Sequence, residues 1–246
     1  MINLDSLLEL LVIPEENVKL FSIRQSNRAK RLIFKPSIRN GFEIVLPRFY
    51  DENWVLATIT KNKPKIEKRL AEIKEARTEL KPTSIILPLI RSSWKVIYRE
   101  TNDKDLDAIT ETPTTLEVSE KAEDAFWTST ILQEWLHEKA LKYLPEYLRD
   151  VSAKLKLPYN KVRIKRQKTL WGSCSNKGNI NLNRNLMLMP SEVVDYVLHH
   201  ELVHLKVLSH SSKFWKELER SFPDYKKIRK QLKYLGGNKL PEWALV

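Results

Sequence analysis

Features of secreted and membrane proteins are missing from this sequence. A single cysteine, Cys174, stands among 246 residues, so the protein cannot form the intramolecular disulfides common in secreted domains. No apolar run approaches the roughly 20 residues of a membrane span. The N-terminal stretch carries Asp5 and Glu9 among its apolar positions and has no basic n-region, unlike a signal peptide. We therefore expect a cytoplasmic protein with no membrane partner.

Internal repeats and low-complexity segments are absent as well. Hydrophobic residues make up 42% of the chain and charged residues 30%, which is ordinary for a globular protein. The length suffices for one large domain or two small ones. The composition therefore argues against disorder and favours a folded protein.

Positive charge is in excess and unevenly spread. The net charge is +12. Residues 119–246 hold 23 Lys and Arg against 14 Asp and Glu, whereas residues 1–118 hold 20 against 17. The C-terminal half could therefore attract a nucleic acid, a nucleotide or an acidic protein. A solubilising surface is the alternative, because the basic residues are scattered along helices without one dense block.

The first half of the chain reads as β-rich. Asn40-Gly41 is a strong hairpin signal between two apolar runs, and Asp51 is a plausible N-cap for a helix that Pro64 ends or kinks. The predicted elements are a short amphipathic helix at 4–11, strands at 30–35 and 42–46, the helix after Asp51, strands at 85–89 and 94–99, and an exposed loop at 101–115.

From Glu120 the pattern changes to longer helices. The predicted elements are helical segments before and after Pro145, a strand at 161–165, a hairpin at 171–182, a helix that Ser191 caps, and helices around 214–218 and 223–236. We expect an α+β fold with a domain change near residue 118. A β-rich domain with a helix, 1–118, precedes a mostly helical domain with a small antiparallel sheet, 119–246.

Four of the five histidines lie close together, and three have the spacing of a metal site. The run HELVH occupies 200–204. On a helix, positions i and i+4 share a face, so His200 and His204 can bind one metal ion with Glu201 beside it. His210 follows six residues later. A catalytic zinc needs three protein ligands and an open position for water.

These residue types suit hydrolysis. Three neutral imidazoles leave a zinc ion with its full positive charge, which lowers the pKa of a bound water toward about 7. Glu201 would take the proton of the water and deliver it to the leaving group. The structural alternative for His200 and His204 is a hydrogen-bonded pair on a half-buried helix face.

The third ligand has alternatives. His210 is favoured by its spacing, but Glu217 or Glu219 on the next helix would also complete a zinc site. His199 lies about 100° from its neighbour around the helix, so it does not join the same metal. For His137 we expect a structural role.

The spacing also equals that of metzincins, whose motif is HExxHxxGxxH. This chain has Val207 where the motif needs glycine. No Met-turn follows, because Met187 and Met189 precede the helix. The sequence therefore does not predict a metzincin.

Several further motifs, in fixed order, resemble the YgjP-like metallopeptidase family, which is related to SprT-like zincins. They are WGSC at 171–174, GNINLN at 178–183, the run 196–204, His210-Ser211 with Phe214-Trp215, and PDY at 223–225. The stretch 28–47 and the helix after it are similar to the leading hairpin of that family. The resemblance covers most of the sequence after Phe21.

This resemblance implies a zincin-like C-terminal domain. Zinc (Zn2+) would be held by His200, His204 and His210, and Glu201 would be the catalytic base. An edge strand beside the metal helix pairs with extended peptides in zincins, and the hairpin at 171–183 is the candidate. The family often has a basic residue directly before WGSC. Leu170 stands there instead, which argues against a charged catalytic group at that position.

Other residues near the motifs have both functional and structural interpretations. Cys174 could be a zinc ligand or a reactive thiol. We favour the alternative that it is a small buried residue that closes the hairpin. Trp171, Phe214 and Trp215 are expected to form walls around the site. The basic stretch 163–168 would line an acidic-substrate groove or be a solvated strand edge.

The leading hypothesis is a zinc-dependent hydrolase, a metallopeptidase acting on peptide or unfolded protein. A metal-activated water can also attack a phosphoanhydride, so a nucleotide hydrolase is the second hypothesis. The third is a nucleic-acid-associated protease or binding module, whose binding would weaken steeply with salt.

Overall fold

A computed structural model of the protein divides into two compact units. It describes residues 11, 18, 20–38, 40–100, 108–120, 125–167, 170–238 and 240–245. One unit holds the described residues up to Leu80, and the other runs from Lys81 to Leu245. The predicted helix at 4–11 lies outside the described residues, apart from Leu11. The compact units thus divide earlier in the sequence than residue 118, where a domain change stays a prediction.

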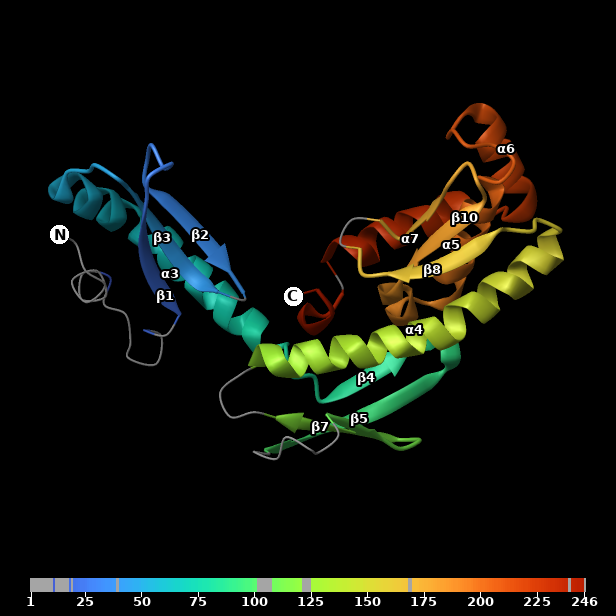
Figure 1. Cartoon of the computed structure of the whole chain (residues 1–246), viewed down its shortest axis with the longest axis horizontal. Helices are drawn as coiled ribbons and strands as arrows, with labels where there is room; N and C mark the ends of the chain where they lie inside the picture. The colour runs from blue at the N-terminus through green and yellow to red at the C-terminus, as the bar shows by residue number, and fades with distance from the viewer. Residues whose placement is uncertain are drawn as a thin grey trace. The chain divides into compact units, whose positions relative to one another are not determined.

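The N-terminal unit is a three-stranded sheet covered by one long helix (Figure 1). Its strands are β1 (Phe21–Ser26), β2 (Ile33–Ser37) and β3 (Gly41–Pro47), in the order β1-β3-β2. β2 and β3 form the predicted antiparallel hairpin, and β1 is parallel to β3. Gly41 has φ +76°, and a Cβ there would lie 2.1 Å from the carbonyl oxygen of Leu20. Only glycine fits at this position.

The helix of this unit, α3 (Glu52–Thr78), begins where its cap predicts but does not end at Pro64. The carboxylate of Asp51 accepts a hydrogen bond of 2.7 Å from the backbone N–H of Trp54. The helix buries residues on both sides of Pro64 against the sheet, namely Val55, Ile59, Ile66, Leu70 and Ile73. Burial of this continuous apolar face favours one helix despite the missing backbone donor.

The second unit begins with a four-stranded sheet in the order β4-β5-β7-β6. The strands are β4 (Ser84–Leu87), β5 (Ser92–Glu100), β6 (Ile109–Glu111) and β7 (Thr115–Glu120), with a short 3-10 helix, η1 (Pro88–Ile90), after β4. β4 and β5 are the predicted strand pair. β6 lies within the stretch predicted as a loop, whose residues 101–107 fall outside the described part.

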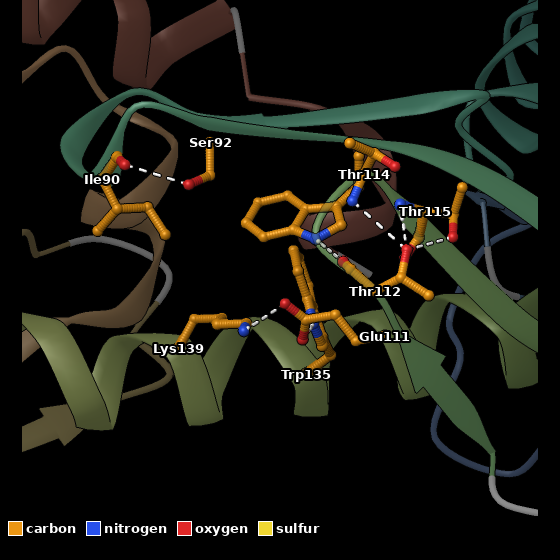
Figure 2. A network of polar contacts seen from close by, with 9 residues as sticks. Ile90, Ser92, Glu111, Thr112, Thr114, Thr115, Trp135 and Lys139 are labelled. Carbon is orange, nitrogen blue, oxygen red and sulfur yellow. Dashed lines mark hydrogen bonds and ion pairs between the residues drawn. The ribbon is translucent and has the colours of Figure 1, made fainter.

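The helix α4 (Ala125–Leu155) joins this sheet to the rest of the unit. It is one helix that runs past Pro145, and it contacts β7, β8 and α5 (Figure 1). Glu111 of the sheet accepts a 2.9 Å hydrogen bond from the Trp135 indole of α4 and pairs at 2.6 Å with Lys139 (Figure 2). The indole of Trp94 meets that of Trp135 edge-on, with ring centroids 5.2 Å apart. Apolar and polar contacts together fix α4 on the sheet.

The remaining elements position the histidines. They are β8 (Lys161–Lys165), β9 (Gly172–Cys174), β10 (Asn179–Asn183), η2 (Arg184–Leu188), α5 (Ser191–Val203), α6 (Ser212–Ser221), α7 (Tyr225–Asn238) and η3 (Glu242–Ala244). β9 and β10 form the predicted antiparallel hairpin, but β8 pairs with β10 in parallel. The sheet, with order β8-β10-β9, is therefore mixed and not purely antiparallel.

The helix α5, which carries His200, starts without the predicted cap. Pro190 holds the N-cap position, the helix has no side-chain cap, and Ser191 is its first residue. Packing supports the helix instead, because Val194, Leu198 and Leu202 are fully buried. The α+β class and the mostly helical C-terminal portion are confirmed. No helix in the described part is long and apolar enough to cross a bilayer.

Candidate metal centre

The three predicted histidines converge at the end of α5. His200 lies in the last turn, His204 is the C-cap residue, and His210 lies between α5 and α6. The Nε2 atom of His210 is 2.9 Å from Nε2 of His200 and 3.2 Å from Nε2 of His204. One nitrogen from each ring lies within 4.8 Å of the others. This cluster could hold a metal ion.

The rings are oriented for metal binding. Nδ1 of His204 is 3.0 Å from the carbonyl oxygen of Val207, so this nitrogen carries the proton and Nε2 presents its lone pair. Nδ1 of His200 is buried without a hydrogen-bond partner in the described part of the protein. Three facing Nε2 atoms cannot all be satisfied by protons shared between them, whereas a cation satisfies all three. The donor set therefore fits zinc.

Two aromatic residues of α6 support the cluster. Phe214 is fully buried, and its ring centroid lies 4.5 Å from that of His204 and 4.9 Å from those of His200 and His210. Trp215 stacks on His210 at 5.6 Å and donates its indole N–H to the His210 carbonyl at 3.0 Å. α6 thus holds the exposed third histidine in place.

Burial keeps the imidazoles of His200 and His204 neutral. It lowers the pKa of His200 to about 3, with further lowering by the neighbouring rings of His204 and His210 and by Arg229. Burial is also the main cause that lowers the pKa of His204. Neutral imidazoles are the form that binds metals.

Glu201 lies beside this cluster and is nearly inaccessible, with 5% of its surface exposed. Burial raises the pKa of its carboxyl group to about 8. Its Oε2 atom has no hydrogen-bond partner among the described residues. A Cβ on Gly172 would lie only 2.6 Å from Glu201 Oε1 and 2.7 Å from Cγ. The start of β9 therefore needs glycine for the carboxylate to occupy its position.

A cleft of about 380 Å³ opens at Glu201 and His200. Three segments line it: the residues leading into β9, the C-terminal half of α5, and α7. The lining residues are Leu170, Trp171, Gly172, Tyr196, Val197, His200, Glu201, Arg229, Leu232 and Lys233. The site thus combines a three-histidine cluster, a buried carboxylate and an open cleft.

The alternative third ligands lie outside the cluster. Glu217 forms ion pairs with Lys206 at 3.3 Å and Arg220 at 2.8 Å, and Glu219 pairs with Lys226 at 3.4 Å. Neither carboxylate belongs to the group of potential metal ligands found in the described residues.

The other histidines and the cysteine are also apart from that group. Nδ1 of His199 is 2.8 Å from the carbonyl oxygen of Asp195, and its ring packs on Phe222. His137 lies on α4. Burial, followed by the charge of Glu201, raises the pKa of the Cys174 thiol to about 11. A thiol so disposed stays protonated near neutral pH.

Two basic residues of the cleft could not be singled out from sequence. Arg229 and Lys233 are four residues apart on α7, and both line the cleft. Their spacing predicts a shared helix face. The neighbouring sequence does not distinguish these two residues from the other lysines of the same helix, which are exposed to solvent.

Comparisons with known proteins bear on this site. The family model described as "YgjP-like, metallopeptidase domain" matches residues 30–235. The structure of the metallopeptidase zymogen abylysin of Pyrococcus abyssi matches with 33% identity and a TM-score of 0.33, covering 37% of this chain and 93% of that one. The metallopeptidase zymogen jannalysin of Methanocaldococcus jannaschii matches with 23% identity and a TM-score of 0.34, covering 38% and 96%. No curated protein matches the sequence.

Proposed function

The chain belongs to the YgjP-like metallopeptidase family, and we propose that it is a zinc-dependent peptidase. The observation that carries this proposal is the convergence of three Nε2 atoms beside a buried carboxylate at an open cleft. That combination is what metal-assisted hydrolysis requires.

The imidazoles of His200, His204 and His210 would hold the zinc ion. When bound, zinc supplies Lewis-acid chemistry, which polarises a carbonyl group and makes water a stronger acid. The protein contributes the orientation. The Val207 carbonyl fixes the tautomer of His204, and the Trp215 indole holds the backbone of His210.

Glu201 serves as general base and then as general acid. Its carboxylate takes a proton from the attacking water and returns it to the amine nitrogen that leaves as the peptide bond breaks. Burial suits this role, because it raises the pKa of the carboxyl group towards neutral pH. A group with such a pKa can both accept and release a proton. Gly172 leaves the space that the side chain needs.

The open edge of strand β9 favours a peptide as the substrate. β10 flanks it on one side, and no strand of the described residues flanks the other. The residues that lead into β9 also line the cleft. An extended peptide pairing with this edge would therefore pass along the cleft beside Glu201.

The test combines metal analysis with activity. Protein purified without chelators should carry about one zinc per molecule and should cleave unfolded protein. We expect His210→Ala to lose zinc and Glu217→Ala to retain it, since Glu217 is engaged by Lys206 and Arg220. Glu201→Gln should retain zinc and lose peptide cleavage.

A parallel assay on nucleoside triphosphates distinguishes cleavage of a peptide bond from cleavage of a phosphoanhydride. If they are hydrolysed and no peptide or unfolded protein is, a phosphoanhydride is the substrate bond and the peptidase proposal is wrong. Zinc-free wild-type protein with full activity would also contradict it. Nucleic-acid binding that weakens with salt and survives Glu201→Gln would indicate a separate binding function.

A further inference from the structure

One face of α7 presents two positive charges to the cleft. Arg229 and Lys233 are one helical turn apart, both are exposed, and both line the cleft with His200 and Glu201. The guanidinium of Arg229 lies 4.8 Å from the centroid of the Trp215 ring. That contact holds it over the helix that supports His210.

These two charges have no carboxylate partner among the residues that the structure describes. In the described part of the protein neither residue forms an ion pair, whereas Lys226 on the same helix pairs with Glu219. Glu201 is the one carboxylate among the residues that line the cleft, and it is buried at the reacting centre. The cleft therefore has a basic wall without a counter-charge.

The opposite wall is apolar. Leu170 and Trp171 line the cleft from the strand side. A Cβ on Gly236 would lie 2.7 Å from Cζ2 of Trp171, so the indole packs directly on α7. An apolar wall facing two cations suits a ligand with a short hydrocarbon stem and an anionic end.

We propose that the cleft is a subsite for a carboxylate of the peptide substrate, held by Arg229 and Lys233. The proposal rests on the peptidase function above and specifies its substrates. The carboxylate belongs to an aspartate or glutamate side group of the peptide or to the peptide's own C-terminus. Because the same cleft contains His200 and Glu201, the acidic group lies within a residue or two of the bond that is cut.

A peptide carboxylate is favoured over a polyphosphate by charge and surroundings. Two cations match one or two negative charges better than the several of a nucleoside triphosphate. The described residues that line the cleft include no glycine-rich turn of the kind that cradles phosphates.

The experiment uses the zinc-loaded protein and matched fluorogenic peptides. One pair differs by Glu or Gln beside the cleaved bond, and a second pair ends in a free or an amidated C-terminus. We expect kcat/KM to be about tenfold or more higher for the acidic member of one pair, as one or two charge-assisted contacts allow. The pair that shows the preference identifies the source of the carboxylate.

Variants assign the preference to the two residues. Arg229→Gln and Lys233→Gln should each reduce the ratio of kcat/KM values by about threefold or more. Lys230→Gln removes the same charge from α7 at an exposed residue that does not line the cleft, and it should leave the ratio unchanged. A ratio near one in wild type, or an equal fall in Lys230→Gln, would overturn the proposal.

Binding to Glu201→Gln protein separates this subsite from the reaction. Calorimetry should show the acidic peptide binding about tenfold more tightly than its neutral partner, and Arg229→Gln in that background should reduce this difference by about threefold or more. If this holds but wild type cleaves no peptide, the peptidase proposal fails and the subsite stands. If a nucleoside triphosphate displaces the acidic peptide and binds more tightly, the subsite is for phosphate and our inference is wrong.

Discussion

Adding one methyl group to Gly172 should disable Glu201 without touching the histidines. The new Cβ would lie 2.6 Å from Oε1, 2.7 Å from Cγ and 2.9 Å from Cδ of Glu201. Carbon atoms pack at about 3.5–4.0 Å, so the glutamate must move by about 1 Å. Both residues lie in contacting elements, β9 and α5, whose core packing resists compensation.

The magnitude follows from that displacement. Misplacing a catalytic group by about 1 Å costs on the order of 10²-fold in rate, so we expect Gly172→Ala to lower kcat/KM on peptides about a hundredfold. Overpacking should lower the free energy of unfolding by about 1–3 kcal/mol. The three Nε2 atoms are unaffected, and zinc content should stay at the wild-type level.

The assay pairs cleavage kinetics with zinc analysis and urea unfolding. Ser173→Ala is the control, because Ser173 is the next residue of β9 and accepts a hydrogen bond of 2.9 Å from the Asn181 side chain within the hairpin. It loosens the same hairpin without reaching Glu201. Wild-type kcat/KM in Gly172→Ala, or an equal loss in Ser173→Ala, would refute the steric argument.

Three further predictions concern proton uptake, ligand support and a helix cap. Burial raises the pKa of Glu201 to about 8 from 4.5, so in metal-free protein its contribution to stability is full below about pH 4.5 and is lost as pH rises through about 8. As the pH rises from about 4.5 to about 8, the free energy of unfolding of Glu201→Gln should increase relative to that of wild type by a few kcal/mol, at about 1.4 kcal/mol per pKa unit. Urea unfolding measures this difference, and a difference that does not depend on pH would contradict the prediction. Trp215→Phe removes the indole N–H that binds the His210 carbonyl, and competition with a chelator should show zinc affinity about tenfold lower; unchanged affinity would mean that stacking alone suffices. Asp51→Ala removes the cap that accepts the backbone N–H of Trp54 and should cost about 1 kcal/mol in thermal unfolding, whereas Asp51→Asn should recover most of it.

Local patterns served best where the chemistry is local. His200 and His204 are one helical turn apart, so helix periodicity alone places them on one face. His210 follows within six residues, and spacing favoured it over Glu217. The structure brings the three imidazoles together and leaves Glu217 in ion pairs with Lys206 and Arg220.

Local rules failed where packing outweighed them. Pro64 does not end α3 and Pro145 does not divide α4, because buried faces extend on both sides of each proline. Ser191 is not a cap, since the core residues of α5 hold the helix without one. The parallel pairing of β8 with β10 joins strands separated by a whole hairpin arm, which no adjacent turn signals.

The sequence by itself determined the family, the mixed class of the fold, the three candidate ligands and the candidate base. These depend on residue type and on spacing within a single turn or hairpin, where backbone geometry leaves few choices. The tertiary structure decided which groups meet across segments: Gly172 against Glu201, Phe214 against the three imidazoles, and the basic face of α7 beside His200 and Glu201 at the cleft. Such contacts join β9, α5, α6 and α7 through burial of a shared core, and the hydrophobic effect that drives this burial is not directional. Which side chains contact one another across these segments is therefore determined only by the packing of the helices and strands.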